Sequence, residues 1–228
     1  VTCGAKQALF NLCLGLLNPG DEAIIPAPYW VSYPDMVRLS GANPVIVETT
    51  AKNGFKLTPE KLDQAITPKT KWIILNSPSN PTGAVYSRDE LEGLATILLK
   101  HPNVHVFSDD IYEHILYLDE KFSTFAEIAP DLKDRVVTMN GVSKAYSMTG
   151  WRIGFAGGPK DLIKAMKKVQ SQSTSNACSI AQAAALEALN GPQNYLQERC
   201  QAFKERRDYL VSALNNIHGI TCDTPMGA

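Results

Sequence analysis

The sequence predicts an α/β fold in which helices cover both faces of a mostly parallel sheet. Short apolar runs bounded by turn residues alternate along the chain with segments of helical periodicity, an order typical of doubly wound domains. The runs are rich in β-branched residues, as strands buried on both faces of a parallel sheet usually are. We expect strands at residues 23–26, 44–47, 72–75, 104–107 and 136–139.

Helices are expected before, between and after these strands. Residues 6–17 place apolar side chains on one side of a helix, and residues 161–172 show the same periodicity. Residues 87–100 begin with Ser87, and Glu90 follows three positions later. This pair predicts a capping box, in which each side chain bonds the backbone N–H of the other residue.

The region from residue 193 onward differs from the rest of the chain. Residues 193–216 have the pattern of one long, highly charged helix, and residues 220–222 then suggest a strand. We therefore divide the chain into a large domain at 1–192 and a long linking helix at 193–228, which ends in the first strand of an incomplete small domain. The chain has no initiator Met and stops without a natural ending, so we expect a piece of a longer protein.

The composition is that of an ordinary globular protein and excludes several classes. The 228 residues are 44% hydrophobic and 20% charged, with a net charge of -1. This balance provides no field to attract nucleic acid or a membrane surface, and no apolar run could span a bilayer. The five cysteines contain no CxxC pair, so we expect reduced thiols in the cytoplasm. The four histidines show no ligand spacing, and we expect no metal site.

Polar side chains follow three neighbouring strands of the predicted sheet. Asn76 follows the third expected strand, Asp109 and Tyr112 follow the fourth, and Lys144 and Arg152 follow the fifth. In open α/β sheets, ligands bind beyond the carboxyl ends of the strands. Convergence of an amide, a carboxylate and an amine at this edge predicts an active site.

Four motifs in this order resemble those of a known enzyme family. They are the run Asn-Ser-Pro-Ser-Asn-Pro-Thr-Gly at 76–83, the run Gly-Val-Ser-Lys at 141–144 with Arg152 eight residues later, the opening Gly-Ala-Lys at 4–6, and Pro-Tyr-Trp at 28–30. The chain is similar to the class I and II aminotransferases of fold type I, of the aspartate aminotransferase kind and truncated at both ends. The resemblance covers essentially the whole chain.

This resemblance implies a three-layer large domain that binds pyridoxal 5'-phosphate, followed by the start of a truncated small domain. It also implies amino acid and 2-oxo acid substrates and a homodimer in the full-length protein. The expected reaction moves an amino group, most naturally from aspartate to 2-oxoglutarate. The cofactor carries the carbanion chemistry of such reactions, and the protein orients and tunes it.

The resemblance assigns catalytic roles to residues at the strand ends. Lys144 would form the Schiff base with the cofactor and shuttle the α-proton. Asp109 would keep the pyridine nitrogen protonated, whereas Asp110 should point to the opposite face of the strand. Tyr112 and Asn80 would hydrogen-bond the phenolic oxygen of the cofactor, which lowers the pKa of the linked lysine nitrogen.

The remaining candidates would hold the phosphate, the ring and the substrate. Gly4, Ala5 and Lys6 begin a helix, whose N-terminal N–H groups suit a phosphate. Arg152 would add a bidentate contact to this phosphate, and Ser143 a hydroxyl.

Trp30 would stack on the cofactor ring and lie against the substrate. Asn80 would also touch the substrate carboxylate. In one bacterial branch of the family a lysine at the position of Lys6 is implicated in recognising the distal carboxylate, which favours an acidic amino acid.

Two kinds of alternative remain open at this point. The same fold serves aromatic, alanine and prephenate aminotransferases and β-eliminating lyases, and it also forms the non-catalytic sensor half of some transcription regulators. The family's substrate-carboxylate arginine, its closing N-terminal segment and the phosphate-binding tyrosine of the partner subunit have no counterpart in these 228 residues. We therefore expect this stretch alone to transaminate poorly or not at all.

Overall fold

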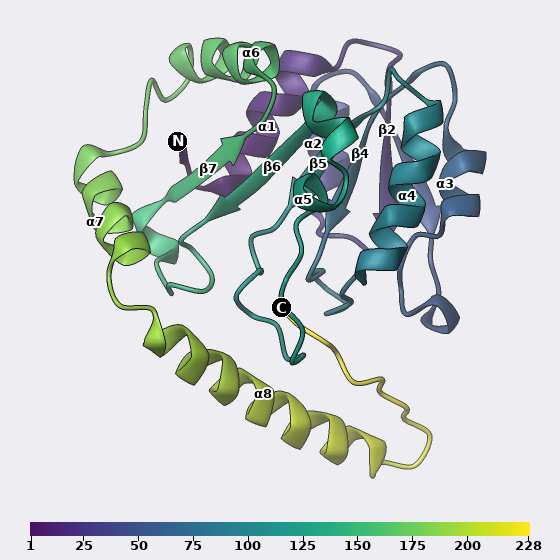
Figure 1. Ribbon diagram of the computed structural model, residues 1–228, viewed down its shortest axis with the longest axis vertical. Coiled ribbons are helices and arrows are strands. Elements are labelled where there is room, and N and C mark those ends of the chain that lie inside the picture. The colour runs from purple at the N-terminus through teal and green to yellow at the C-terminus, as the bar shows by residue number, and fades with distance from the viewer.

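A seven-stranded sheet of order β1-β7-β6-β5-β4-β2-β3 organises the computed structural model, which describes residues 1–228 (Figure 1). The strands β3, β2, β4, β5 and β6 run parallel, and β7 pairs antiparallel with both β6 and β1. The strands are β1 (Thr2–Cys3), β2 (Glu22–Ala27), β3 (Asn43–Glu48), β4 (Thr70–Asn76), β5 (His105–Asp109), β6 (Val136–Gly141) and β7 (Ile153–Gly157).

The expected α/β class and the mostly parallel sheet are confirmed, and all five predicted strands form. The strands β1 and β7 were not predicted from the sequence. The strand β1 has two residues, and β7 has the sequence Ile-Gly-Phe-Ala-Gly, in which glycines weaken the strand signal. A Cβ at Gly154 would overlap the backbone of Ala5, so the glycine is needed where the first helix packs against β7.

Helices cover both faces of the sheet and make three layers. The helices are α1 (Ala5–Leu16), α2 (Ser32–Leu39), α3 (Pro59–Ala65), α4 (Arg88–Lys100), α5 (Phe125–Ile128), α6 (Lys160–Ser171), α7 (Ser179–Asn190) and α8 (Asn194–Asn215), with short 3-10 turns η1 (Ala51–Asn53), η2 (Pro130–Arg135) and η3 (Thr149–Trp151). The predicted capping box of α4 is present in both directions between Ser87 and Glu90.

Alternate residues of the central strands feed two separate cores. Trp72 and Ile74 of β4 pack in a cluster with α1, α2 and α6, while Ile73 and Leu75 pack in a second cluster with α3, α4 and α5. Full burial of such side chains stabilises the fold by about 1.5–3 kcal/mol each. The apolar runs of the sequence therefore mark strands that are buried on both faces.

The long helix predicted after residue 193 is confirmed as α8, which extends away from the sheet (Figure 1). The strand predicted at residues 220–222 does not form, so that expectation was wrong for this chain. No strand lies beside this segment, and Cys222 instead exchanges hydrogen bonds with the side chain of Asn215. The domain boundary between residues 192 and 193 stays a prediction.

Candidate active site

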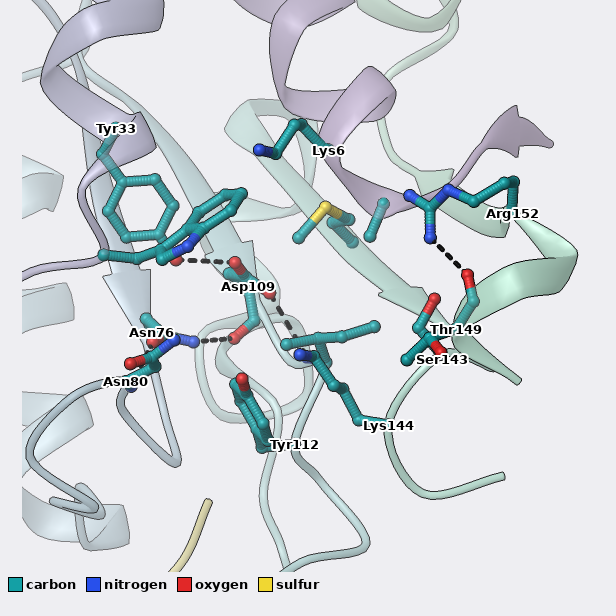
Figure 2. Close-up of a pocket in the computed structure, with 14 residues that line it drawn as sticks. Lys6, Tyr33, Asn76, Asn80, Asp109, Tyr112, Ser143, Lys144, Thr149 and Arg152 are labelled. Carbon is teal, nitrogen blue, oxygen red and sulfur yellow. Dashed lines mark hydrogen bonds between the residues drawn. The ribbon is translucent and has the colours of Figure 1, made fainter. Parts of the chain in front are cut away.

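The carboxyl ends of three parallel strands meet at the same level of the sheet. Asn76 of β4 pairs with Asp109 of β5, and Asp109 pairs with Met139 of β6. A cavity of about 160 Å³ opens at this edge, and concave sites at such strand ends are where α/β proteins bind small molecules. Its lining residues are Ala5, Lys6, Trp30, Tyr33, Asn76, Asn80, Asp109, Ile111, Tyr112, Met139, Ser143, Lys144, Thr149 and Arg152 (Figure 2).

Every site residue expected from the sequence lines this cavity except Gly4, which lies beneath Arg152. The structure thus brings together segments that are up to 148 positions apart, from Gly4 to Arg152. Two further polar lining residues, Tyr33 and Thr149, were not predicted from the sequence, and Asn76 was expected at this edge without a specific contact. Their contacts show how the expected residues are held.

Asp109 is a buried carboxyl group at the deep end of the cavity, with 3% of its surface exposed. The Tyr33 hydroxyl donates a hydrogen bond of 2.6 Å to its Oδ2 atom, and the Ile111 amide donates one of 3.3 Å to Oδ1 (Figure 2). Burial raises the pKa of Asp109 to about 7, although the Tyr33 hydrogen bond opposes that rise. A cation placed against Asp109 would restore the ionised form, because opposite charge favours a carboxylate.

The neighbouring acid Asp110 does not line the cavity. Its carboxylate accepts a hydrogen bond of 2.6 Å from the Ser108 hydroxyl, and burial raises its pKa to about 6. The two adjacent acids therefore have different surroundings, as alternation along a strand predicts. Only Asp109 is available to a ligand in the cavity.

Asn76 connects β5 with the loop that carries Asn80. Its amide nitrogen donates to the Asp109 carbonyl oxygen at 2.9 Å, and its amide oxygen accepts from the Asn80 backbone N–H at 2.8 Å. Both bonds use groups at the strand end, which Asn76 reaches because it is the last residue of β4. Asn76 therefore holds the backbone at Asn80 close to the end of β4.

Lys144 projects into the middle of the cavity from the turn after β6 (Figure 2). Its ammonium nitrogen lies 5.4 Å from the centroid of the Tyr112 ring and forms no salt bridge. The positive charge of Lys144 is also close enough to favour the ionised form of Asp109. An amine without a fixed partner, beside a phenol and a carboxyl group, can act as a nucleophile and as a proton carrier.

The other end of the cavity carries groups that suit an anion. Helix α1 begins at Ala5, and no side chain caps its first turn, so its N–H groups and positive dipole end are available. Arg152 lies over this helix start, where a Cβ at Gly4 would overlap its guanidinium group. The Arg152 Nη1 atom donates to the Thr149 carbonyl at 2.7 Å, and Ser143 lines the same end (Figure 2).

Trp30 and Lys6 form the wall between the two ends. The Lys6 ammonium nitrogen lies 4.7 Å from the centroid of the Trp30 ring, a cation–π distance. The Trp30 ring meets the Tyr33 ring edge to face, with centroids 5.4 Å apart. Tyr33 therefore contacts Asp109 through its hydroxyl and Trp30 through its ring, and Lys6 places a positive charge against the Trp30 ring.

The charges are arranged for one kind of ligand. An anionic group would meet Arg152 and the start of α1, a cationic ring nitrogen would meet Asp109, and a carbonyl group between them would meet Lys144. No group of three or more His, Cys, Asp or Glu side chains is arranged to hold a metal ion. Pyridoxal 5'-phosphate carries these three features, so the residues present fit this cofactor.

Comparisons with known proteins agree with this interpretation. The family described as Aminotransferase class I and II matches residues 1–228. The chain is 61% identical over its whole length to the aspartate/prephenate aminotransferase of Cereibacter sphaeroides. It superposes with a TM-score of 0.98 on the crystal structure of the aspartate aminotransferase from Rhizobium meliloti at 56% identity, and with 0.95 on the aromatic aminotransferase from Pyrococcus horikoshii at 35%.

The chain spans only part of these relatives. It covers 57% of the Cereibacter protein, 57% of the Rhizobium chain and 60% of the Pyrococcus chain. No helix of the structure has the length and apolar character needed to cross a membrane. All five cysteines are free thiols.

Proposed function

Because this chain belongs to the class I and II aminotransferase family, we propose that the full-length protein moves an amino group from an L-amino acid to a 2-oxo acid. The observation that carries the proposal is the arrangement within one cavity of the Lys144 amine, the buried Asp109 and the anion site at Arg152. Aspartate and 2-oxoglutarate are the proposed substrates. The alternative of a non-catalytic sensor is disfavoured, since the similar proteins are named as enzymes.

The proposed cofactor is pyridoxal 5'-phosphate, which supplies an aldehyde and a ring that accepts electrons. Lys144 would hold the aldehyde carbon and later move the proton at the substrate α-carbon. Asp109 would be ionised by the ring nitrogen and would hold the proton on that nitrogen. Burial of Asp109 strengthens this ion pair, because charges attract more strongly where water is excluded.

The remaining residues would bind and orient the cofactor. Gly4, Ala5 and Lys6 at the start of α1 would hold the phosphate, together with Ser143 and Arg152. Tyr112 and Asn80 would hydrogen-bond the phenolic oxygen of the cofactor ring. Trp30 would stack on the face of that ring. Support for this assignment comes from the positions of these groups around the cavity.

Substrate choice is proposed from the wall of the cavity. Lys6 would pair with the distal carboxylate of an acidic substrate, and Asn80 and Trp30 would contact its other groups. A second acceptor, prephenate, is favoured by the name of the Cereibacter relative. Both proposed acceptors carry a second carboxylate, which a lysine at this position could recognise.

We also propose a cytoplasmic homodimer. The five free cysteines fit a reducing compartment. On α7 the residues Ile180 and Leu186 are 73% and 62% exposed, and apolar surface of this kind suits an interface between copies.

The test compares amino donors in the full-length protein with pyridoxal 5'-phosphate added. Aspartate should convert the visible band of the lysine-bound cofactor to that of its amino form, and 2-oxoglutarate should reverse the change. Lys6→Gln should raise KM for aspartate and leave KM for alanine nearly unchanged. The proposed reaction would be overturned if none of aspartate, alanine, phenylalanine and tyrosine converted the cofactor band.

A further inference from the structure

The loops that carry Asn80 and Tyr112 are both bonded to the end of the chain. The backbone N–H groups of Met226 and Gly227 donate to the Gly83 carbonyl oxygen at 2.9 and 3.0 Å. The segment 225–228, which we call the tail segment, thereby contacts the loop that follows β4 and contains Asn80. Figure 1 shows the tail segment returning from the far end of α8 to the edge of the sheet.

The same segment also pairs with the loop that follows β5 and contains Tyr112. The Tyr117 N–H donates to the Met226 carbonyl at 2.9 Å, and the Ala228 N–H donates to the Ile115 carbonyl at 3.0 Å. These bonds form a β-bridge between Leu116 and Gly227. The tail segment therefore lies between the two loops and is hydrogen-bonded to both.

Two glycines make this close approach possible. A Cβ at Gly227 would lie 2.7 Å from the Ile115 carbonyl oxygen and 2.7 Å from the Pro78 Cβ. A Cβ at Gly83 would lie 2.5 Å from the Pro225 Cβ. Any side chain at either position would push the tail segment away from the loops.

Arg207 anchors the tail segment to α8. Its Nη1 atom donates to the Pro225 carbonyl at 2.8 Å, and its guanidinium carbon lies 4.7 Å from the centroid of the Tyr117 ring. The Asp208 carboxylate lies 2.6 Å from its Nη2 atom. Only 14% of the Arg207 side chain is exposed, so this arginine joins helix, tail segment and loop in one packed contact.

We propose that the tail segment, anchored by Arg207, positions Asn80 and Tyr112, so that the placement of α8 sets the geometry of these two site residues. The inference rests on the proposed function for what the two residues bind. Neither loop is regular secondary structure. The loop at Asn80 is otherwise held by bonds among residues 76–84, such as Asn80 N–H to the Asn76 side chain and Ser79 N–H to the Ala84 carbonyl. Arg207 is a positioning residue, since it does not line the cavity.

The first experiment needs no cofactor. Amide hydrogen exchange is compared between Gly227→Ala and the control Gly157→Ala, because a Cβ at Gly157 meets nothing within 4 Å. The N–H groups of Ser79, Gly83 and Tyr117 should exchange at least about tenfold faster in Gly227→Ala only. Equal exchange in the two variants would overturn the proposal.

A second pair of variants tests the anchor without changing the backbone. Arg207→Gln should loosen the same amides, whereas Arg206→Gln should not, because Arg206 is exposed, lies over the Phe203 ring and makes no hydrogen bond to the tail segment. In the full-length protein with pyridoxal 5'-phosphate, Arg207→Gln should raise KM for the amino donor about fivefold to thirtyfold, with a smaller change in kcat.

The two proposals can fail separately. If the unsubstituted protein binds no pyridoxal 5'-phosphate, the proposed function fails, and the exchange comparison still decides whether the tail segment holds the loops. If the unsubstituted protein binds the cofactor and Arg207→Gln matches Arg206→Gln in both exchange and KM, the positioning role of Arg207 is contradicted.

Discussion

The two ends of the cavity carry opposite kinds of charged group, one buried and one exposed. At the deep end, Asp109 has 3% of its surface exposed and receives a hydrogen bond from the buried Tyr33. At the other end, Arg152 is exposed and sits over the free N-terminus of α1. At the deep end, ionising the single buried acid is unfavourable unless a cation lies beside it. At the open end, several hydrogen-bond donors face the same space.

This difference separates a residue that would set the protonation of a ligand from residues that would bind it. A desolvated carboxyl group responds strongly to a cation placed beside it, because burial penalises its lone charge. Exposed donors are weaker individually, and several must act on one anion. Changes at the deep end should therefore affect chemistry and folding stability, whereas changes at the open end should affect mainly cofactor affinity.

The largest effect is expected from Asp109→Asn in the full-length protein. An amide cannot hold the proton on a ring nitrogen, so kcat/KM should fall about 1,000-fold, a loss typical of removing a preorganised charge. The matched change Asp110→Asn should lose no more than about tenfold, because Asp110 lies outside the cavity. Equal losses in steady-state assays of the two variants would remove the distinction between the two acids.

The same substitution should stabilise the cofactor-free protein at high pH. The pKa of Asp109 is raised by burial from 3.8 to about 7, so the stability linked to its neutral form is present below pH 3.8 and is lost as pH rises through 7. The amide of the Asp109→Asn variant cannot ionise, and its advantage in unfolding free energy should grow from pH 4 to pH 8 by on the order of 2 to 4 kcal/mol.

Urea unfolding at both pH values measures this difference. The exposed acid Asp35, whose side chain is 71% accessible, provides the control Asp35→Asn, which should change the unfolding free energy by much less than Asp109→Asn because Asp35 is not desolvated. If the difference in unfolding free energy between Asp109→Asn and the unsubstituted protein does not change with pH, the Asp109 carboxyl group is not desolvated, which would contradict the structure.

At the open end, Arg152→Ala should weaken binding of pyridoxal 5'-phosphate about 100-fold. The loss corresponds to a pair of charge-assisted hydrogen bonds in a partly exposed site. Arg152→Lys should recover part of the affinity, since lysine keeps the charge and loses the fork of donors. Equilibrium titration followed by absorbance gives both values, and unchanged affinity in the alanine variant would place the phosphate elsewhere.

The smallest effect is expected from Tyr33→Phe. The Tyr33 hydrogen bond lowers the pKa of Asp109, so its removal should raise that pKa further and shift ionisation of Asp109 to higher pH. Activity should fall about tenfold, in line with the loss of one hydrogen bond to a charged group. Tyr29→Phe is the control, because the tyrosine bonded to Asp109 is Tyr33 and not Tyr29. Infrared titration of the Asp109 carboxyl group in both variants checks the direction of the pKa change.

The sequence predicted the sheet better than the contacts made at its edge. Apolar runs located five strands because those strands are buried on both faces. The strand β7 was missed because Gly154 is required by the packing of α1, a long-range demand that local propensity does not contain. The predicted strand after residue 219 failed because no partner strand lies beside it.

The site was predicted as a set of residues and not as a network. Polar residues after successive strands, together with the resemblance to aminotransferases, placed Lys144, Asp109 and Arg152 in one cavity. The hydrogen bond between Tyr33 and Asp109 joins residues 76 positions apart, and local sequence periodicity cannot predict such a long-range pair. Asn76 stood at a strand end in the sequence analysis, but its two bonds required the register between β4 and β5.

The most direct test of the account is the location of the bound cofactor. The full-length protein is incubated with pyridoxal 5'-phosphate, reduced with borohydride, digested and mapped by mass spectrometry, with Lys144→Ala in parallel. We expect the added mass on the peptide that contains Lys144 and no labelling at this site in the variant. Labelling of Lys6 in its place, or no specific labelling of the unsubstituted protein, would contradict it.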